Sequence, residues 1–184
     1  MGEALAKQTA VEYLAWEPKQ EERHIYVRGE IFAISGGTFE HNEIALNLAV
    51  ALKSHLKGAP CKVGINDMRV AVEKADCYFY PDVFVTCATR DTQDPKITEV
   101  YEAKLIAEVL SESTASYDRG AKFADYRQLS SLEEYVLIDP DARTVEVFRK
   151  NASHIWELHP SNAASPSVSL NSVGWQGNLA DFFG

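Results

Sequence analysis

The chain is poor in cysteine, in basic residues and in long apolar runs, and each shortage excludes certain kinds of site or protein class. Its three cysteines, Cys61, Cys77 and Cys87, have neither CxxC spacing nor a cluster of histidines beside them. We therefore expect no disulfide framework and no structural zinc, and a reducing, cytoplasmic location. No charged-then-apolar segment opens the sequence, and no apolar run reaches the ~18 residues of a membrane span. Gly36-Gly37 lacks the lysine of a phosphate loop, so no nucleotide cofactor is indicated.

Acidic residues outnumber basic ones by 27 to 18, which gives a formal net charge of −9. This balance argues against a broad electrostatic footprint on nucleic acid. A modest basic cluster does lie at the end of a predicted helix, at Lys53, His55, Lys57 and Lys62. It either touches a phosphate backbone or complements the dipole of that helix.

The hydrophobic patterns predict one mixed α/β domain spanning all 184 residues. Apolar residues at helical spacing predict helices over 9–17, 40–57 and about 113–129. Alternating or continuous apolar runs predict strands over 65–73, 79–87 and 103–111, with hairpins at 25–34 and 134–148. Residues 159–172 are expected to form a loop, and the apolar end 179–183 to dock on the core. We expect a central mixed sheet flanked by helices, with hairpins toward both ends.

Two carboxylates interrupt apolar, β-branched runs that otherwise resemble buried strands. Asp82 follows Tyr80-Pro81, and Glu108 lies between Ala107 and Val109. Burying an ionised carboxylate costs several kcal/mol unless a cation, a proton or hydrogen bonds compensate. A single buried acid is commonly a hydrogen-bonded structural residue. Two on successive strands favour a shared partner, and a divalent metal is the simplest one.

A lysine on the next predicted helix could complete such a site. Asp118, Lys122 and Tyr126 are spaced i, i+4, i+8 and share one helix face. Tyr126 also belongs to the apolar stripe with Phe123 and Leu129, so Lys122 borders the face turned toward the sheet. The alternative for Lys122 is an exposed ion pair with Asp118.

Several short motifs, in order, make the chain resemble the Uma-type family of putative restriction endonucleases, within the PD-(D/E)XK nuclease superfamily. Pro81-Asp82 and Glu108-Val109-Leu110 resemble the superfamily signature. The resemblance runs over about 12–149, leaving 150–184 as a C-terminal extension that ends in the family's Leu-Ala-Asp-Phe-Phe. The further motifs that carry it are Gly29-Glu30-Ile31, His41-Asn42-Glu43-Ile44, Ser113-Thr114, Asp118-Arg119-Gly120, Lys122, Tyr126, Glu134-Tyr135 and Ile138-Asp139-Pro140.

The resemblance implies a restriction-endonuclease-like fold and metal-dependent attack on a phosphodiester of DNA. It assigns Asp82, Glu108 and the backbone carbonyl of Val109 to Mg²⁺ or Mn²⁺. Leu110 stands where the superfamily has its catalytic lysine, so that role passes to Lys122 on the helix.

Four further residues are secondary candidates. Glu30 could add an outer carboxylate or be an exposed edge charge, and His41 could join the site or be a core histidine. Tyr126 and Asp118 accompany Lys122.

Two functions from different classes follow. One is a DNA endonuclease, expected as a homodimer because cutting both strands favours a two-fold protein. The other is a catalytically inactive binding or assembly module of the same fold, which the acidic net charge and the missing strand lysine favour.

Overall fold

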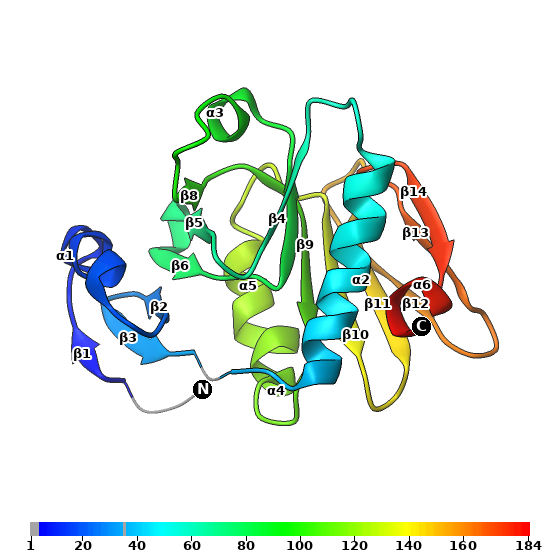
Figure 1. Cartoon of the computed structure of the whole chain (residues 1–184), viewed down its shortest axis with the longest axis horizontal. Helices are drawn as coiled ribbons and strands as arrows, with labels where there is room; N and C mark the ends of the chain where they lie inside the picture. The colour runs from blue at the N-terminus through cyan, green and yellow to red at the C-terminus, as the bar shows by residue number, and fades with distance from the viewer. Residues whose placement is uncertain (1–3, 35) are drawn as a thin grey trace.

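The computed structural model describes residues 4–34 and 36–184 and builds them into two six-stranded sheets lying beside each other (Figure 1). The N-terminal sheet has the order β1-β3-β2-β6-β5-β8, with strands β1 Ala6–Lys7, β2 His24–Val27, β3 Glu30–Ala33, β5 Arg69–Val72, β6 Cys77–Phe79 and β8 Glu99–Val100. The central sheet has the order β12-β11-β10-β9-β7-β4, with strands β4 Lys62–Ile65, β7 Val83–Thr86, β9 Ala103–Val109, β10 Glu134–Asp139, β11 Thr144–Lys150 and β12 Trp156–Ser161. A small third sheet pairs β13 Ser167–Leu170 with β14 Trp175–Asn178.

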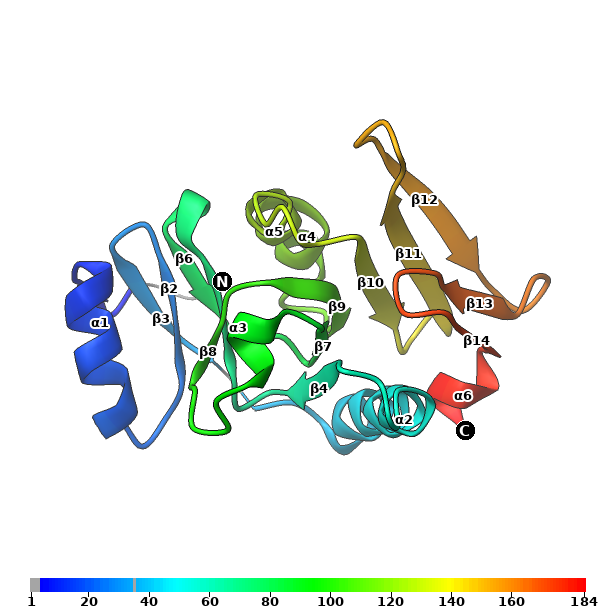
Figure 2. The same cartoon turned by 90° about the horizontal axis from the view of Figure 1, so that it is seen from above.

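Helices cover both faces of the central sheet. The helices of the described chain are α1 Ala10–Trp16, α2 Phe39–His55, α3 Thr89–Thr92, α4 Ala115–Tyr117, α5 Phe123–Tyr126 and α6 Ala180–Phe183, with 3-10 turns at Glu17–Lys19 and Glu73–Ala75. Helix α1 packs on the N-terminal sheet through Tyr13. Figure 2 shows α2 and the α4–α5 segment on opposite sides of the central sheet. No helix in the described ranges has the length and apolar character that a membrane crossing needs. The expected mixed fold with flanking helices is confirmed.

The long helix α2 forms where its spacing predicts it. The Thr38 side chain caps its first turn by accepting a hydrogen bond from the His41 amide at 3.1 Å. Ile44, Leu48 and Leu52 recur every fourth residue and are buried against the central sheet. The helix therefore fixes His41 at the edge of that sheet.

Strands β9 and β10 are the parallel pair of the central sheet, and the chain crosses between them through residues 115–126. A parallel pair requires such a crossover, which places the helical segment over one face of its own two strands. Buried Phe123, Tyr126 and Leu129 pack there against Ile106 and Tyr135. The predicted helix at about 113–129 is thus present, with a π-helical stretch at Asp118–Lys122 in its middle.

The predicted hairpins are also present, while three expectations are wrong. The strand predicted over 65–73 is broken at Asn66-Asp67, so that β4 and β5 join different sheets. The expected loop over 159–172 contains the end of β12 and all of β13. Cys61 and Cys87 form a disulfide, because the antiparallel pairing of Lys62 with Thr86 brings the flanking cysteines together. The expectation of no disulfide is corrected accordingly.

Candidate active site

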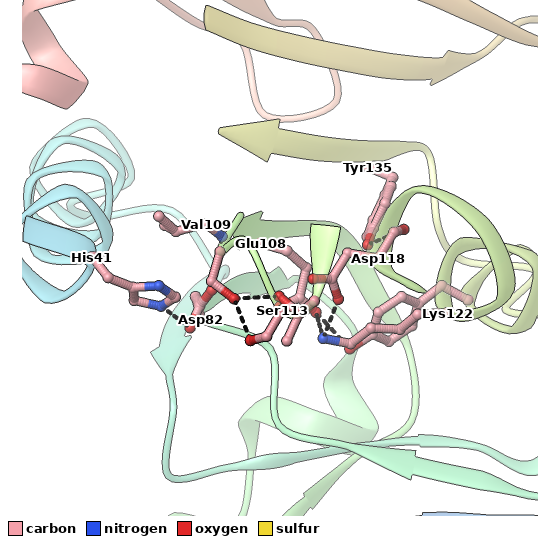
Figure 3. A network of polar contacts seen from close by, with 11 residues as sticks. His41, Asp82, Glu108, Val109, Ser113, Asp118, Lys122 and Tyr135 are labelled. Atoms are coloured by element: carbon pink, nitrogen blue, oxygen red, sulfur yellow. Dashed lines mark hydrogen bonds and ion pairs between the residues drawn. The ribbon is translucent and has the colours of Figure 1, made fainter. Parts of the chain in front are cut away.

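The central sheet places Asp82 and Glu108 side by side. Strands β7 and β9 are antiparallel, with Val83 opposite Ala107. Asp82 immediately precedes Val83, and Glu108 immediately follows Ala107. The antiparallel register therefore sets Asp82 beside Glu108. Figure 3 shows His41 reaching this pair from one side and Lys122 from the other. The alternation of side chains predicted for both strands agrees with the packing, since Val83 and Ala107 face α2 while Ile106 faces the crossover helix.

Asp82 is held by a bond to each of its carboxylate oxygens. Its Oδ1 lies 2.9 Å from Nε2 of His41, and its Oδ2 accepts a hydrogen bond of 2.7 Å from the Val109 amide. Val109, the residue whose carbonyl is the expected third oxygen, is thus tied to Asp82 through its amide. The hydrogen bond to Asp82 raises the pKa of His41 above its ordinary value, against the effect of burial. His41 is therefore a partner of Asp82 and not an isolated core histidine.

Glu108 is a fully enclosed acid at the centre of the network. Its Oε1 accepts hydrogen bonds from Lys122 Nζ at 2.8 Å and from the Tyr126 hydroxyl at 3.0 Å. Burial raises the pKa of Glu108 to about 8, and the negative charges of Asp82 and Asp118 add to the increase, although Lys122 opposes it. The charged form of this carboxyl group therefore depends on a nearby cation, which Lys122 supplies in this structure.

Lys122 bridges two acids from the π-helical stretch. Its ammonium lies 2.8 Å from Glu108 and 3.1 Å from Asp118, and only 12% of its side chain is exposed. Burial alone would lower the pKa of Lys122, but the two carboxylates outweigh it and raise the pKa above its usual range. Lys122 thus pairs with Asp118 inside the cluster, and the pair is nearly buried and not exposed as the alternative had it. Single π-helical turns of this kind occur frequently at functional sites.

Two groups near the cluster were not among the candidate site residues predicted from the sequence. The Tyr135 hydroxyl donates to the backbone oxygen of Asp118 at 3.1 Å and so supports the segment that carries Lys122. Period-two alternation in β10 was the available signal, because it places Tyr135 on the face that meets the crossover helix. At the rim, Ser111 Oγ lies 3.2 Å from Ser113 Oγ and 2.9 Å from Thr114 Oγ1.

Glu30 is the candidate that the fold does not bring to this cluster. It lies on β3 of the N-terminal sheet, 3.9 Å from Lys7, with 44% of its side chain exposed. Glu30 therefore has the exposed charge of the second interpretation, although β3 lies between β1 and β2 and is not an edge strand.

The fold is that of a nuclease-like protein. A crystal structure of a putative nuclease belonging to DUF820 from Anabaena variabilis superposes with a TM-score of 0.80, at 19% identity, covering 96% of this chain and 97% of that one. The family model Uma2, described as "Putative restriction endonuclease", matches residues 10–180. The chain belongs to this family, as its motifs predict.

Two relatives come from Synechocystis sp., and both are uncharacterized proteins. One is 36% identical over 163 residues, which cover 89% of this chain and 84% of the relative. The other is 36% identical over 155 residues, covering 82% and 85%.

Proposed function

We propose that this protein is a divalent-metal-dependent endonuclease that hydrolyses phosphodiester bonds in DNA. The single observation that carries the proposal is the convergence of Asp82, Glu108 and Lys122 from three separate elements into one cluster. Membership of a family of putative restriction endonucleases supports DNA as the substrate class.

The donor atoms fit Mg²⁺ or Mn²⁺ better than a metal held by protein side chains alone. In the described part of the chain, no three His, Cys, Asp or Glu side chains are grouped to hold a metal. Mg²⁺ is usually bound through one or two carboxylates and keeps several waters. Asp82 and Glu108 would supply the two carboxylates, and the Val109 carbonyl would add a third oxygen. When bound, such an ion lowers the pKa of a coordinated water and neutralises charge on the phosphate.

Lys122 would serve as a charged hydrogen-bond donor. Because its pKa is raised, the ammonium stays protonated at neutral pH and cannot act as a general base. Held by Glu108 and Asp118, it is fixed in a low-dielectric setting where a positive charge stabilises the developing charge of a phosphoryl transition state. His41 would position Asp82 through the contact to Oδ1.

One observation favours the alternative of an inactive nuclease-fold module. Lys122 already bonds to both Glu108 and Asp118, so these carboxylates are compensated in part without any metal. An ion pair retained for folding alone would have the same geometry. The two functions differ in what happens to DNA, which makes a cleavage assay decisive.

The test is cleavage of covalently closed plasmid DNA, which has no ends, with Mg²⁺, with Mn²⁺ and with EDTA. We expect nicked and linear products only with metal, and a loss of about 10²-fold or more in the Asp82→Asn variant. An RNA of matched sequence would report the preference between the two nucleic acids. A folded wild-type protein that cleaves no plasmid in either metal, or cleavage equal in Asp82→Asn, would refute the proposal.

A further inference from the structure

Helix α2 carries an apolar stripe on the face turned away from the central sheet. Phe39 is 80% exposed, Leu46 is 50% exposed and Val50 is 58% exposed. At 100° per residue these three side chains lie within about 40° of one another around the helix axis, and they span about 16 Å along it. They form a single stripe, whereas the inner positions Ile44 and Leu48 are buried. We call these three residues the α2 stripe.

No other element of the described chain covers the α2 stripe. The C-terminal helix α6 lies against a neighbouring side of α2, where Asn47 Nδ2 donates to the Phe182 backbone oxygen at 3.0 Å. Figures 1 and 2 both show α2 on the outside of the molecule with α6 beside it. Monomers rarely leave contiguous large apolar side chains this exposed, so such a patch indicates an interaction surface.

An acidic residue flanks the α2 stripe toward its amino-terminal end, and basic residues flank it toward its carboxy-terminal end. Glu43 lies on this face in the amino-terminal half of the helix, and Lys53 in the carboxy-terminal half. Lys57 follows in the turn after the helix. All three charged side chains are exposed, and no ion pair joins them to another described residue.

The α2 stripe and its flanking charges are self-complementary when two copies of α2 pack antiparallel. In an antiparallel pair of α2 helices centred on position 48, Leu46 meets Val50 of the second copy. The same centre sets Glu43 opposite Lys53. Parallel packing would instead place like charges together.

The same centre also sets Phe39 opposite Lys57, a cation over an aromatic ring. A two-fold axis repeats each contact, as an isologous interface requires.

We infer that a second copy of this chain docks on the α2 stripe, with the two α2 helices antiparallel. The apolar side chains supply the contact area, and the exposed charge pairs select the antiparallel direction. A nucleic acid does not suit this surface, because its centre is apolar and Glu43 lies on it. The inference is independent of the proposed nuclease chemistry.

The first test is sedimentation velocity of the full chain over a wide range of concentrations. We expect the average mass to rise toward that of a dimer, and Leu46→Glu to weaken self-association by about tenfold or more. Leu158→Glu is the matched control, since Leu158 on β12 is 48% exposed and lies on another element. Circular dichroism would verify that both variants fold.

The second test reverses charges. Glu43→Lys and Lys53→Glu should each weaken the dimer at low salt, because each places like charges opposite one another. Mixing these two variants should restore association, since every pair across the interface is then of opposite sign. Three results would overturn the inference: a monomer at all concentrations, a dimer that only Leu158→Glu weakens, or a mixture no tighter than the single variants.

Discussion

Lys122 Nζ lies 2.8 Å from Glu108 Oε1, and this contact joins the crossover helix to the strand that precedes it. The PD-(D/E)XK pattern that the sequence resembles has a lysine two residues after its glutamate, and Leu110 stands at that position here. Leu110 is buried among the apolar residues of the same face. The crossover helix covers that face, and its Lys122 supplies the positive charge to Glu108. The arrangement leads to predictions about each member of the cluster.

Lys122→Ala should lower the rate of DNA cleavage by about 10²–10³, the usual loss for one positioned charge in a hydrolytic site. The variant should also lose about 3 kcal/mol of unfolding free energy, because it removes the partner of buried carboxylates. Single-turnover cleavage and urea unfolding would measure the two effects. Adding Leu110→Lys should restore part of the activity, since both positions address Glu108.

The control for Lys122 is Lys104→Ala. Lys104 lies on β9 and forms an ion pair of 3.0 Å with Glu133, but its side chain is 31% exposed. Exposed pairs contribute little, so this variant should be as active and nearly as stable as the wild type. Full activity in Lys122→Ala would remove Lys122 from the mechanism.

Metal binding should raise the melting temperature of the wild-type protein. A ligand that binds only the folded state stabilises it, by about 2.7 kcal/mol at a hundred times its dissociation constant. Asp82→Asn should abolish the gain from Mg²⁺ or Mn²⁺, while Glu21→Gln, at an exposed position, should retain it. A melting curve that is unchanged by millimolar metal would contradict the metal assignment.

Sequence alone predicts the elements that carry the cluster, because their signals are local. The i, i+4 spacing of Asp118 and Lys122 and the alternation around Glu108 both survive in the structure. What escaped prediction depends on contacts between distant segments. Cys61 and Cys87 are 26 residues apart, and only the pairing of β4 with β7 makes them neighbours.

Other errors have local physical causes. Strand β12 is almost entirely exposed between Glu157 and Pro160, so it lacks the alternation that marks a half-buried strand. The break after β4 comes at Asn66, which adopts a positive φ of 27° although no glycine or proline marks a turn there. The bond from His41 to Asp82 joins two distant segments, and only the packing of α2 on the central sheet creates it.

Stability in EDTA should fall as the pH rises from about 5 to 8. The folded state raises the pKa of Glu108 from 4.5 to about 8. Within this window folding takes up a proton that the unfolded chain lacks, so each rise in pH lowers the free energy of unfolding. His41, whose pKa is also raised, gives a slope of the same sign nearer neutral pH.

The contribution of Glu108 can be isolated by comparison. Glu108→Gln should flatten the pH dependence of urea unfolding and be more stable than the wild type at pH 8, because the amide needs no proton. The other charged groups that face Glu108, which are Asp82, Asp118 and Lys122, stay in place in this variant. Equal slopes in the two proteins would show that the Glu108 pKa is not raised.

Removing the partner of Asp82 should weaken metal binding without unfolding the site. His41→Ala leaves Asp82 Oδ1 without its bond at 2.9 Å, so that the Val109 amide alone holds the carboxylate. Losing such an outer partner typically reduces metal affinity or activity by about 10–100-fold. His41→Gln keeps a side-chain donor and should retain more affinity than His41→Ala. Calorimetric titration with Mn²⁺ would measure the affinities of the two variants directly.

His55→Gln is the control, since His55 lies at the far end of α2 and its ring hydrogen-bonds the Val173 backbone oxygen at 3.0 Å, away from Asp82. If His41→Ala binds Mn²⁺ as tightly as His55→Gln does, His41 has no part in positioning Asp82.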